Sequence, residues 1–122
     1  MNKNKPIILL DPYPRTMDLL FSKENLNYLK KNFKLITAPN KNKNNFYEKN
    51  LPSADYIFGQ PNLPSSLISK STKLKAIFNV ESNFMDNMDY DYCFRNGIHV
   101  LATSPVFAQP VAEMAMGLTL SI

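Results

Sequence analysis

The sequence predicts an α/β fold in which a mostly parallel sheet of about five strands is covered by helices on both faces. Three observations predict it. Short apolar runs that end at Pro, Gly or Asp recur along the 122 residues, as expected for strands buried on both faces. Segments with helix caps or helical spacing alternate with these runs, which is typical of right-handed βαβ units. The length allows one compact domain with its own core.

Each predicted strand is short and stops at a residue that disfavours its continuation. The first ends before Asp11 and Pro12, and these two with Pro14 then predict a loop. The second ends before Pro39, and the third ends at Gly59. The five strands are predicted at residues 6–10, 34–38, 55–59, 76–80 and 98–102.

The predicted helices are placed by their caps. Ser22 is a predicted N-cap, with Glu24 in the first turn, for a helix that ends near Phe33. Residues 40–50 are polar and rich in Asn and Lys, and predict a surface connection with about one helical turn. Residues 64–69 predict a short helix whose first residue is a proline.

A second capped helix lies between the fourth and fifth strands. Asp89 is its predicted N-cap, Asn96 its last residue, and Gly97 occupies the position that ends it. The order of elements is that of the flavodoxin-like doubly wound class, in which ligands bind outside the carboxyl ends of the strands. The loops at residues 11–15, 59–62, 81–87 and 103–109 are therefore the predicted site.

Composition excludes several classes of function. The net charge of +4 comes from lysines interleaved with Asn, and Arg15 and Arg95 are the only arginines, which disfavours nucleic-acid binding. A single cysteine, Cys93, and a single histidine, His99, exclude an intrachain disulfide and offer almost no zinc ligands. No stretch has the length of a signal or membrane segment, so a cytoplasmic location and no membrane contact are expected.

Residues 74–120 resemble the D-isomer-specific 2-hydroxyacid dehydrogenases. The sequence Leu-Lys-Ala-Ile from residue 74 looks like the strand that enters that family's substrate loop. Asp-Asn-Met-Asp from residue 86 looks like its D-N-I-D signature, and Asn-Gly-Ile-His-Val from residue 96 looks like its R-G-I-x-V. Thr-Ser-Pro from residue 103 and Val-Ala-Glu from residue 111 look like the N-T-P and V-A-E that open its interdomain helix.

The resemblance implies a two-domain enzyme that oxidises a 2-hydroxy acid with NAD or NADP, in a family that is typically homodimeric. This chain would supply the substrate (catalytic) domain over residues 1–105 and the start of the hinge helix over residues 106–122. The Rossmann cofactor domain, with the catalytic Arg, Glu and His, would lie outside it, so no catalytic residue is assigned to this chain. Only Gly59, Gly97 and Gly117 occur, too few for a dinucleotide fingerprint.

The substrate loop departs from the family pattern. The family's loop is rich in glycine, and its backbone N–H groups hold the substrate carboxylate. Here Ser82, Asn83 and Phe84 replace those glycines, and Ser82 and Asn83 add side-chain donors. Gln60 after the third strand is a further candidate, and Gln109 is the amide nearest to the family's Asn. These five residues are the predicted substrate contacts for a small 2-hydroxy or 2-keto acid.

Three simpler interpretations stand beside these. Asp86 and Asp89 suit turn and cap positions better than an acid–base pair. Cys93 suits a small buried hydrophobe better than a catalytic thiolate. The whole chain could instead be a stand-alone binding or interaction module that keeps the fold without the chemistry.

The last segment, residues 110–122, predicts a helix with Pro110 near its first position. Its apolar residues occupy nearly the whole circumference, and such a helix requires burial on every side. We therefore expect this helix to pack against a surface that the chain itself does not supply.

Overall fold

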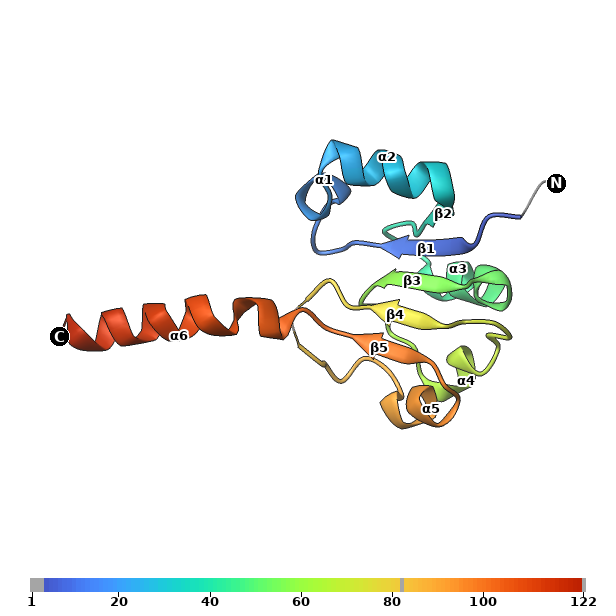
Figure 1. Ribbon diagram of the computed structural model, residues 1–122. Helices are drawn as coiled ribbons and strands as arrows, with labels where there is room; N and C mark the ends of the chain where they lie inside the picture. The colour runs from blue at the N-terminus through green and yellow to red at the C-terminus, as the bar shows by residue number, and fades with distance from the viewer. Residues whose placement is uncertain (1–3, 82, 122) are drawn as a thin grey trace.

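A single five-stranded sheet forms the centre of the molecule (Figure 1). The computed structural model describes residues 4–81 and 83–121. All neighbouring strands pair in parallel, in the order β2-β1-β3-β4-β5. The predicted flavodoxin-like class is confirmed, and no strand end differs from the prediction by more than two residues. The strands are β1 (Ile7–Asp11), β2 (Lys34–Thr37), β3 (Tyr56–Gly59), β4 (Ala76–Phe78) and β5 (His99–Leu101).

Two of the predicted helix caps are confirmed. The hydroxyl of Ser22 accepts a hydrogen bond from the backbone N–H of Asn25, and a carboxylate oxygen of Asp89 accepts one from Tyr92 at 2.8 Å. Gly97 has φ of +71°, the left-handed conformation that ends a helix. The helices are α1 (Met17–Leu20), α2 (Lys23–Asn32), α3 (Lys43–Asn50), the 3₁₀ turn η1 (Leu51–Ser53), α4 (Ser65–Ile68), α5 (Tyr90–Arg95) and α6 (Ser104–Leu120).

The expectation of about one helical turn in residues 40–50 is wrong, because α3 spans eight residues. Its Tyr47 is only 1% exposed and belongs to the hydrophobic core. The polar sequence around Tyr47 hides this role, since one buried aromatic residue does not make a periodic pattern. The short helix α1 was not predicted either; Phe21, which ends it, packs on Phe58 with ring centroids 4.9 Å apart.

The predicted start of the last helix is also wrong. Helix α6 begins at Ser104, with Pro105 in its first turn, and Pro110 lies inside it. Proline suits the first turn because the N–H groups there have no intrahelical partner. Pro110 removes one hydrogen bond from the helix interior. In an exposed helix, water can satisfy the carbonyl that this leaves free.

The two faces of the sheet are covered unequally. Leu9, Ile57, Ile77 and Val100 are register partners on one face, and helices α3, α4 and α5 bury them in the main core. On the other face, the rings of Phe58 and Phe78 stack 5.8 Å apart. Their neighbour Leu101 is 48% exposed, so the side chains on this face are less well covered near β5.

Helix α6 projects away from the sheet (Figure 1). None of its described residues is buried. Its apolar side chains include Val106, Met114 and Leu120, which are 71%, 70% and 83% exposed. Nothing in the described part of the chain covers this helix, and its packing against another surface stays a prediction. No helix in the described part of the chain is long and apolar enough to cross a membrane.

Candidate functional site

The loop that follows β4 is held at the carboxyl edge of the sheet by Gln60. The side-chain oxygen of Gln60 accepts a hydrogen bond from the N–H of Glu81 at 3.0 Å. Its amide nitrogen donates to the carbonyl of Asn83 at 3.1 Å. One side chain from the end of β3 thus fixes the loop on both sides of residue 82. Ser82 itself, a predicted contact, lies outside the described residues.

The far end of the same loop is anchored by a second set of bonds. Leu63 forms a parallel bridge with Met88, and the N–H of Leu63 donates to the carbonyl of Asn87 at 2.7 Å. The amide of Asn87 donates to the carbonyl of Pro61, also at 2.7 Å. The signature-like residues 86–89 therefore work as an anchor. Asp86 lies exposed in a turn, as its simpler interpretation predicted.

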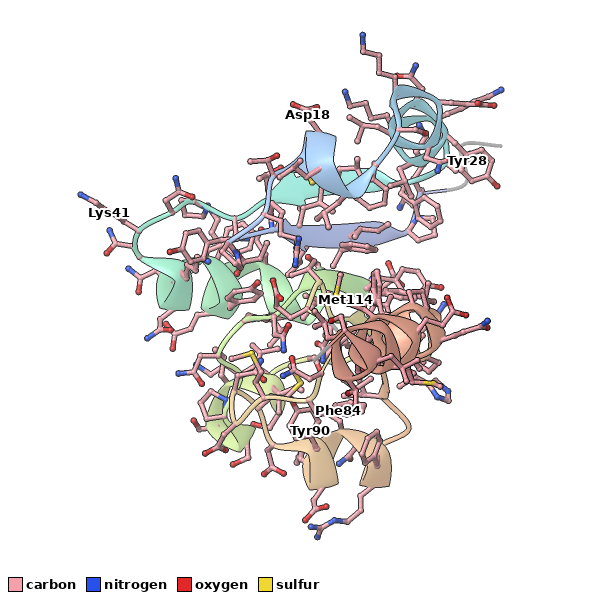
Figure 2. The ribbon with its side chains drawn as sticks, turned by 90° about the vertical axis from the view of Figure 1, so that its left-hand side faces the viewer. Asp18, Tyr28, Lys41, Phe84, Tyr90 and Met114 are labelled. Atoms are coloured by element: carbon pink, nitrogen blue, oxygen red, sulfur yellow. The ribbon has the colours of Figure 1, made fainter. Side chains whose placement is uncertain are left out.

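Phe84 and Tyr90 close the outer side of the loop. Their rings meet edge to face with centroids 5.2 Å apart, and Figure 2 shows the two side chains together beside α5. The hydroxyl of Tyr90 donates to the carbonyl of Met85 at 2.6 Å. Desolvation raises the pKa of Tyr90, although the Met85 bond acts against this shift. Phe84 remains 55% exposed, so it offers an apolar surface at the edge of the loop.

Two neighbouring grooves lie between this loop and the start of α6. The larger, of about 650 Å³, contains Arg15 and Asn79 among mostly apolar walls. The smaller, of about 500 Å³, contains Glu81 and Asn83. Phe107 and Val111 line both grooves. We define them together as the β4 cleft.

The predicted residues are brought together only in part. Gln60 and Asn83 are in direct contact, and Phe84 follows them on the loop. Gln109 lies on α6, where its amide donates to Glu113 at 2.9 Å within the same helix. It is not among the residues that line either groove.

Asn79 is a site residue that was not singled out from the sequence. It is only 3% exposed and lines the larger groove. Its backbone N–H donates to the carbonyl of Leu101, but both polar atoms of its side chain lack a hydrogen-bond partner among the described residues. A buried amide left in this state costs about 1–3 kcal/mol. A polar residue directly after a buried apolar strand is the signal that could have identified it.

Arg15 and Glu81 join the loops that follow β1 and β4. The guanidinium donates to the two carboxylate oxygens at 3.3 and 3.5 Å. Their side chains are 48% and 29% exposed. The pair is therefore a solvent-screened contact, of the kind that contributes at most about 1 kcal/mol to stability.

The end of β1 carries a separate polar cluster. The buried carboxylate of Asp11 pairs with the ammonium of Lys43 at 2.6 Å and accepts a hydrogen bond from the hydroxyl of Tyr47 at 3.0 Å. Burial raises the pKa of Tyr47, and the charge of Asp11 raises it further. Both oxygens of Asp11 are thus satisfied within the fold, and this cluster ties α3 to the sheet.

The described residues do not form a site that fits a dinucleotide. Pyrophosphate binding requires a glycine-rich turn between a strand and the start of a helix. The turn after β1 instead holds the Asp11 carboxylate, and Gly59 is needed for close packing against Asp11. No cluster of three metal-ligating side chains occurs among the described residues either.

Cys93 is fully buried, and burial raises the pKa of its thiol, which agrees with a packing role.

The solved structures that resemble this chain include two oxidoreductases. A phosphoglycerate oxidoreductase from Rhizobium etli is 38% identical, with a TM-score of 0.80 over 96% of this chain and 36% of its own. An NAD-dependent formate dehydrogenase from Staphylococcus aureus, in complex with NAD, is 20% identical, with a TM-score of 0.53 over 78% of this chain and 31% of its own. No family model and no curated protein matches the chain.

The likeness covers only part of these enzymes. The chain spans about a third of the length of each, 36% and 31%. Both enzymes are members of the family that residues 74–120 resemble, so the resemblance found in the sequence is confirmed. The 20% identity of the second structure bears on the fold alone.

Proposed function

We propose that this chain is the substrate-binding portion of an oxidoreductase that acts on the CH–OH group of a 2-hydroxy acid. The premise is that the chain belongs to the D-isomer-specific 2-hydroxyacid dehydrogenase family. The proposal assigns residues 1–105 to a substrate domain and residues 106–122 to the start of a hinge helix. The family likeness supports NAD or NADP as the electron acceptor. The cofactor and the catalytic Arg, Glu and His are assigned to a part of the enzyme outside this chain.

The observation that carries the proposal is the clamp that Gln60 places on the loop after β4. By binding Glu81 and Asn83, Gln60 holds this segment at the carboxyl edge of the sheet, beside the β4 cleft. Ligands of doubly wound folds bind at this edge. A loop fixed in advance loses less conformational entropy when it binds an anion.

The chain's own residues bind and orient the substrate in this account. The loop backbone and the side chains of Ser82 and Asn83 are assigned to the substrate carboxylate. Gln60 holds the loop, Phe107 lines both grooves, and Phe84 offers an apolar surface at the edge of the loop. Gln109 is retained as a contact from α6. Orienting the carboxylate fixes C2, the carbon whose hydrogen is transferred to the cofactor, and positioning of this kind lowers the barrier.

Binding calorimetry tests the proposal. The purified protein is titrated with lactate, glycerate and 2-hydroxybutyrate, and with lactamide as the uncharged control. Saturable binding of the acids, with Kd of roughly 0.1–10 mM and at least about tenfold weaker binding of lactamide, is expected. The variant N83A should weaken binding of the acids. E48Q, which breaks an exposed ion pair elsewhere, should leave their binding unchanged. Equal binding of lactate and lactamide would refute a carboxylate site.

A stand-alone binding module is the second candidate. It is favoured by Glu81, which places a carboxylate in the loop that the first candidate assigns to a substrate anion. The same titration separates the two candidates. Binding of neutral or cationic compounds in preference to 2-hydroxy acids would favour the module, and preference for the acids would favour the substrate domain.

A further inference from the structure

Helix α5 is followed by an asparagine and a glycine. Asn96 and Gly97 form the only Asn–Gly pair in the sequence, and both residues are exposed. Asn96 stands where the family pattern R-G-I-x-V has arginine, so the pair is a feature of this chain and not of that pattern. Gly97 ends the helix in the left-handed conformation, with φ of +71°.

We propose that Asn96 is a site of covalent self-modification, at which deamidation converts the asparagine to aspartate and isoaspartate. The nucleophile is the backbone nitrogen of Gly97, and the only other reactant is water. The inference is independent of the proposed function, because it involves no ligand and none of the residues assigned to the substrate.

The reaction has two steps, and neither needs an oxidant or a cofactor. The Gly97 nitrogen bonds to Cγ of Asn96, the bond from Cγ to Nδ2 breaks, and ammonia leaves with the proton of the Gly97 N–H. Water then opens the succinimide ring that results. Cleavage between the Gly97 nitrogen and Cγ gives aspartate. Cleavage between that nitrogen and the main-chain carbonyl carbon of Asn96 gives isoaspartate.

Gly97 leaves the attacking nitrogen accessible. It has no side chain, and a β-carbon built at this position would meet no atom of the described residues within 4 Å. Glycine also has the widest choice of backbone conformations, so the nitrogen reaches Cγ at little steric cost. Other exposed asparagines, such as Asn40, Asn42 and Asn45, precede lysine or phenylalanine, whose side chains restrict this approach.

Two hydrogen bonds have to break before the nitrogen attacks. Nδ2 of Asn96 donates to the carbonyl of Tyr92 at 2.8 Å, and the N–H of Gly97 donates to that of Phe94 at 3.3 Å. Both bonds lie at the end of a helix of only six residues, and helix ends fray. The next residue is held more firmly, because the N–H of Ile98 donates at 2.8 Å to the carbonyl of the fully buried Cys93. The opening is therefore confined to the end of α5, and the rest of the fold stays in place.

The products weaken the connection between α5 and β5. A carboxylate at position 96 cannot donate to the carbonyl of Tyr92, so the 2.8 Å bond is lost. It also places a negative charge at the C-terminal end of a helix, where the helix dipole disfavours it. Isoaspartate adds a further carbon to the main chain two residues before Ile98, which belongs to the core. Both products therefore lower the stability of the fold.

Peptide mapping of the full chain by mass spectrometry tests the proposal. The purified protein is kept at neutral pH and 37 °C for several weeks, and deamidation is measured at every asparagine. Asn96 should convert at least about tenfold faster than Asn40, Asn42 or Asn45, with isoaspartate among its products. G97A should slow this conversion at least about tenfold, because its β-carbon crowds the nitrogen. Conversion of Asn96 no faster than that of the other three, or an equal rate in G97A, would refute the proposal.

A second variant guards against misfolding of G97A, since alanine is strained at φ of +71°. Circular dichroism shows whether G97A folds. In N96Q the side chain is one carbon longer, so the attack would have to close a six-membered ring, which forms more slowly. Conversion at position 96 should then be lost, and conversion at the wild-type rate in N96Q would also overturn the proposal.

The variant N96D measures the effect of the product by itself. Its melting temperature should lie roughly 1–4 °C below that of the wild type, because a hydrogen bond is lost and a charge opposes the helix dipole. N40D adds the same charge in an exposed bend and should melt as the wild type does. Equal melting of N96D and the wild type would contradict the effect assigned to the product.

Discussion

Gly59 lies against the backbone of Asp11, so closely that a β-carbon at position 59 would overlap the Asp11 carbonyl oxygen. The same β-carbon would lie 2.9 Å from the Cβ of Asp11. This contact pairs the last residues of β1 and β3, which are register partners. It brings the Asp11 cluster and Gln60 to one edge of the sheet, and so it sets the geometry on which the candidate site is built.

The variant G59A should therefore destabilise the protein. Since the overlap is with backbone, the strands must separate, and a loss of about 2–3 kcal/mol in the free energy of unfolding is expected. Urea unfolding measures it. G117A is the matched control, because a β-carbon there meets nothing within 4 Å, and alanine favours a helix. An equal loss in both variants would contradict this account of Gly59.

Removing the Gln60 clamp should loosen the loop without unfolding the domain. Q60A deletes the bonds to Glu81 and Asn83, and a loss of about 1–2 kcal/mol is expected because Gln60 is partly buried. Amide hydrogen exchange should become faster at residues 80–85. N50A, which removes a local side-chain bond to Phe46, is the control and should leave that exchange unchanged. Unchanged exchange in Q60A would show that other contacts hold the loop.

Stability should fall in alkaline solution because of Tyr47. Its pKa in the folded state is raised well above the ordinary value of 10.0 by burial and by Asp11. Above that ordinary value the unfolded chain releases the tyrosine proton while the folded chain keeps it. The unfolded state then binds fewer protons, so the free energy of unfolding decreases as pH rises. Urea unfolding between pH 8 and 11 should show this decline, and Y47F should make it shallower. An identical decline in Y47F would exclude Tyr47 as its source.

Cys93 should react slowly with thiol reagents in the folded protein. Its side chain is fully buried, and desolvation together with the charge of Asp89 raises the pKa of the thiol, so little thiolate forms at neutral pH. Reaction with DTNB at pH 8 should be at least about tenfold faster in 6 M guanidinium chloride than in buffer. Rapid reaction in the native state would contradict the packing role.

Much of the fold could be predicted because its signals are local. Strands buried on both faces appear as continuous apolar runs, and Ser22 and Asp89 cap helices through bonds to residues three positions away. The start of α6 was misplaced for a local reason too. Pro105 and Pro110 both suit a first turn, and the sequence does not say which one occupies it.

The candidate site was less predictable because its contacts are long-range. Gln60 was identified from its place after a strand, but its bonds to Glu81 and Asn83 join residues more than 20 positions apart. The pairing of Arg15 with Glu81 depends on which strands become neighbours. Asn79 depends on burial, which follows from the packing of the whole sheet.

Chemical-shift mapping by NMR tests the central claim most directly. A 2-hydroxy acid is titrated into the ¹⁵N-labelled protein, and the backbone amides and the Gln60 side-chain amide are followed. The largest saturable shifts are expected at residues 79–85 and at Gln60, with little change around Lys70 and Glu48, which line a separate groove. Saturable shifts confined to that other groove, or no saturable shifts at residues 79–85, would contradict it.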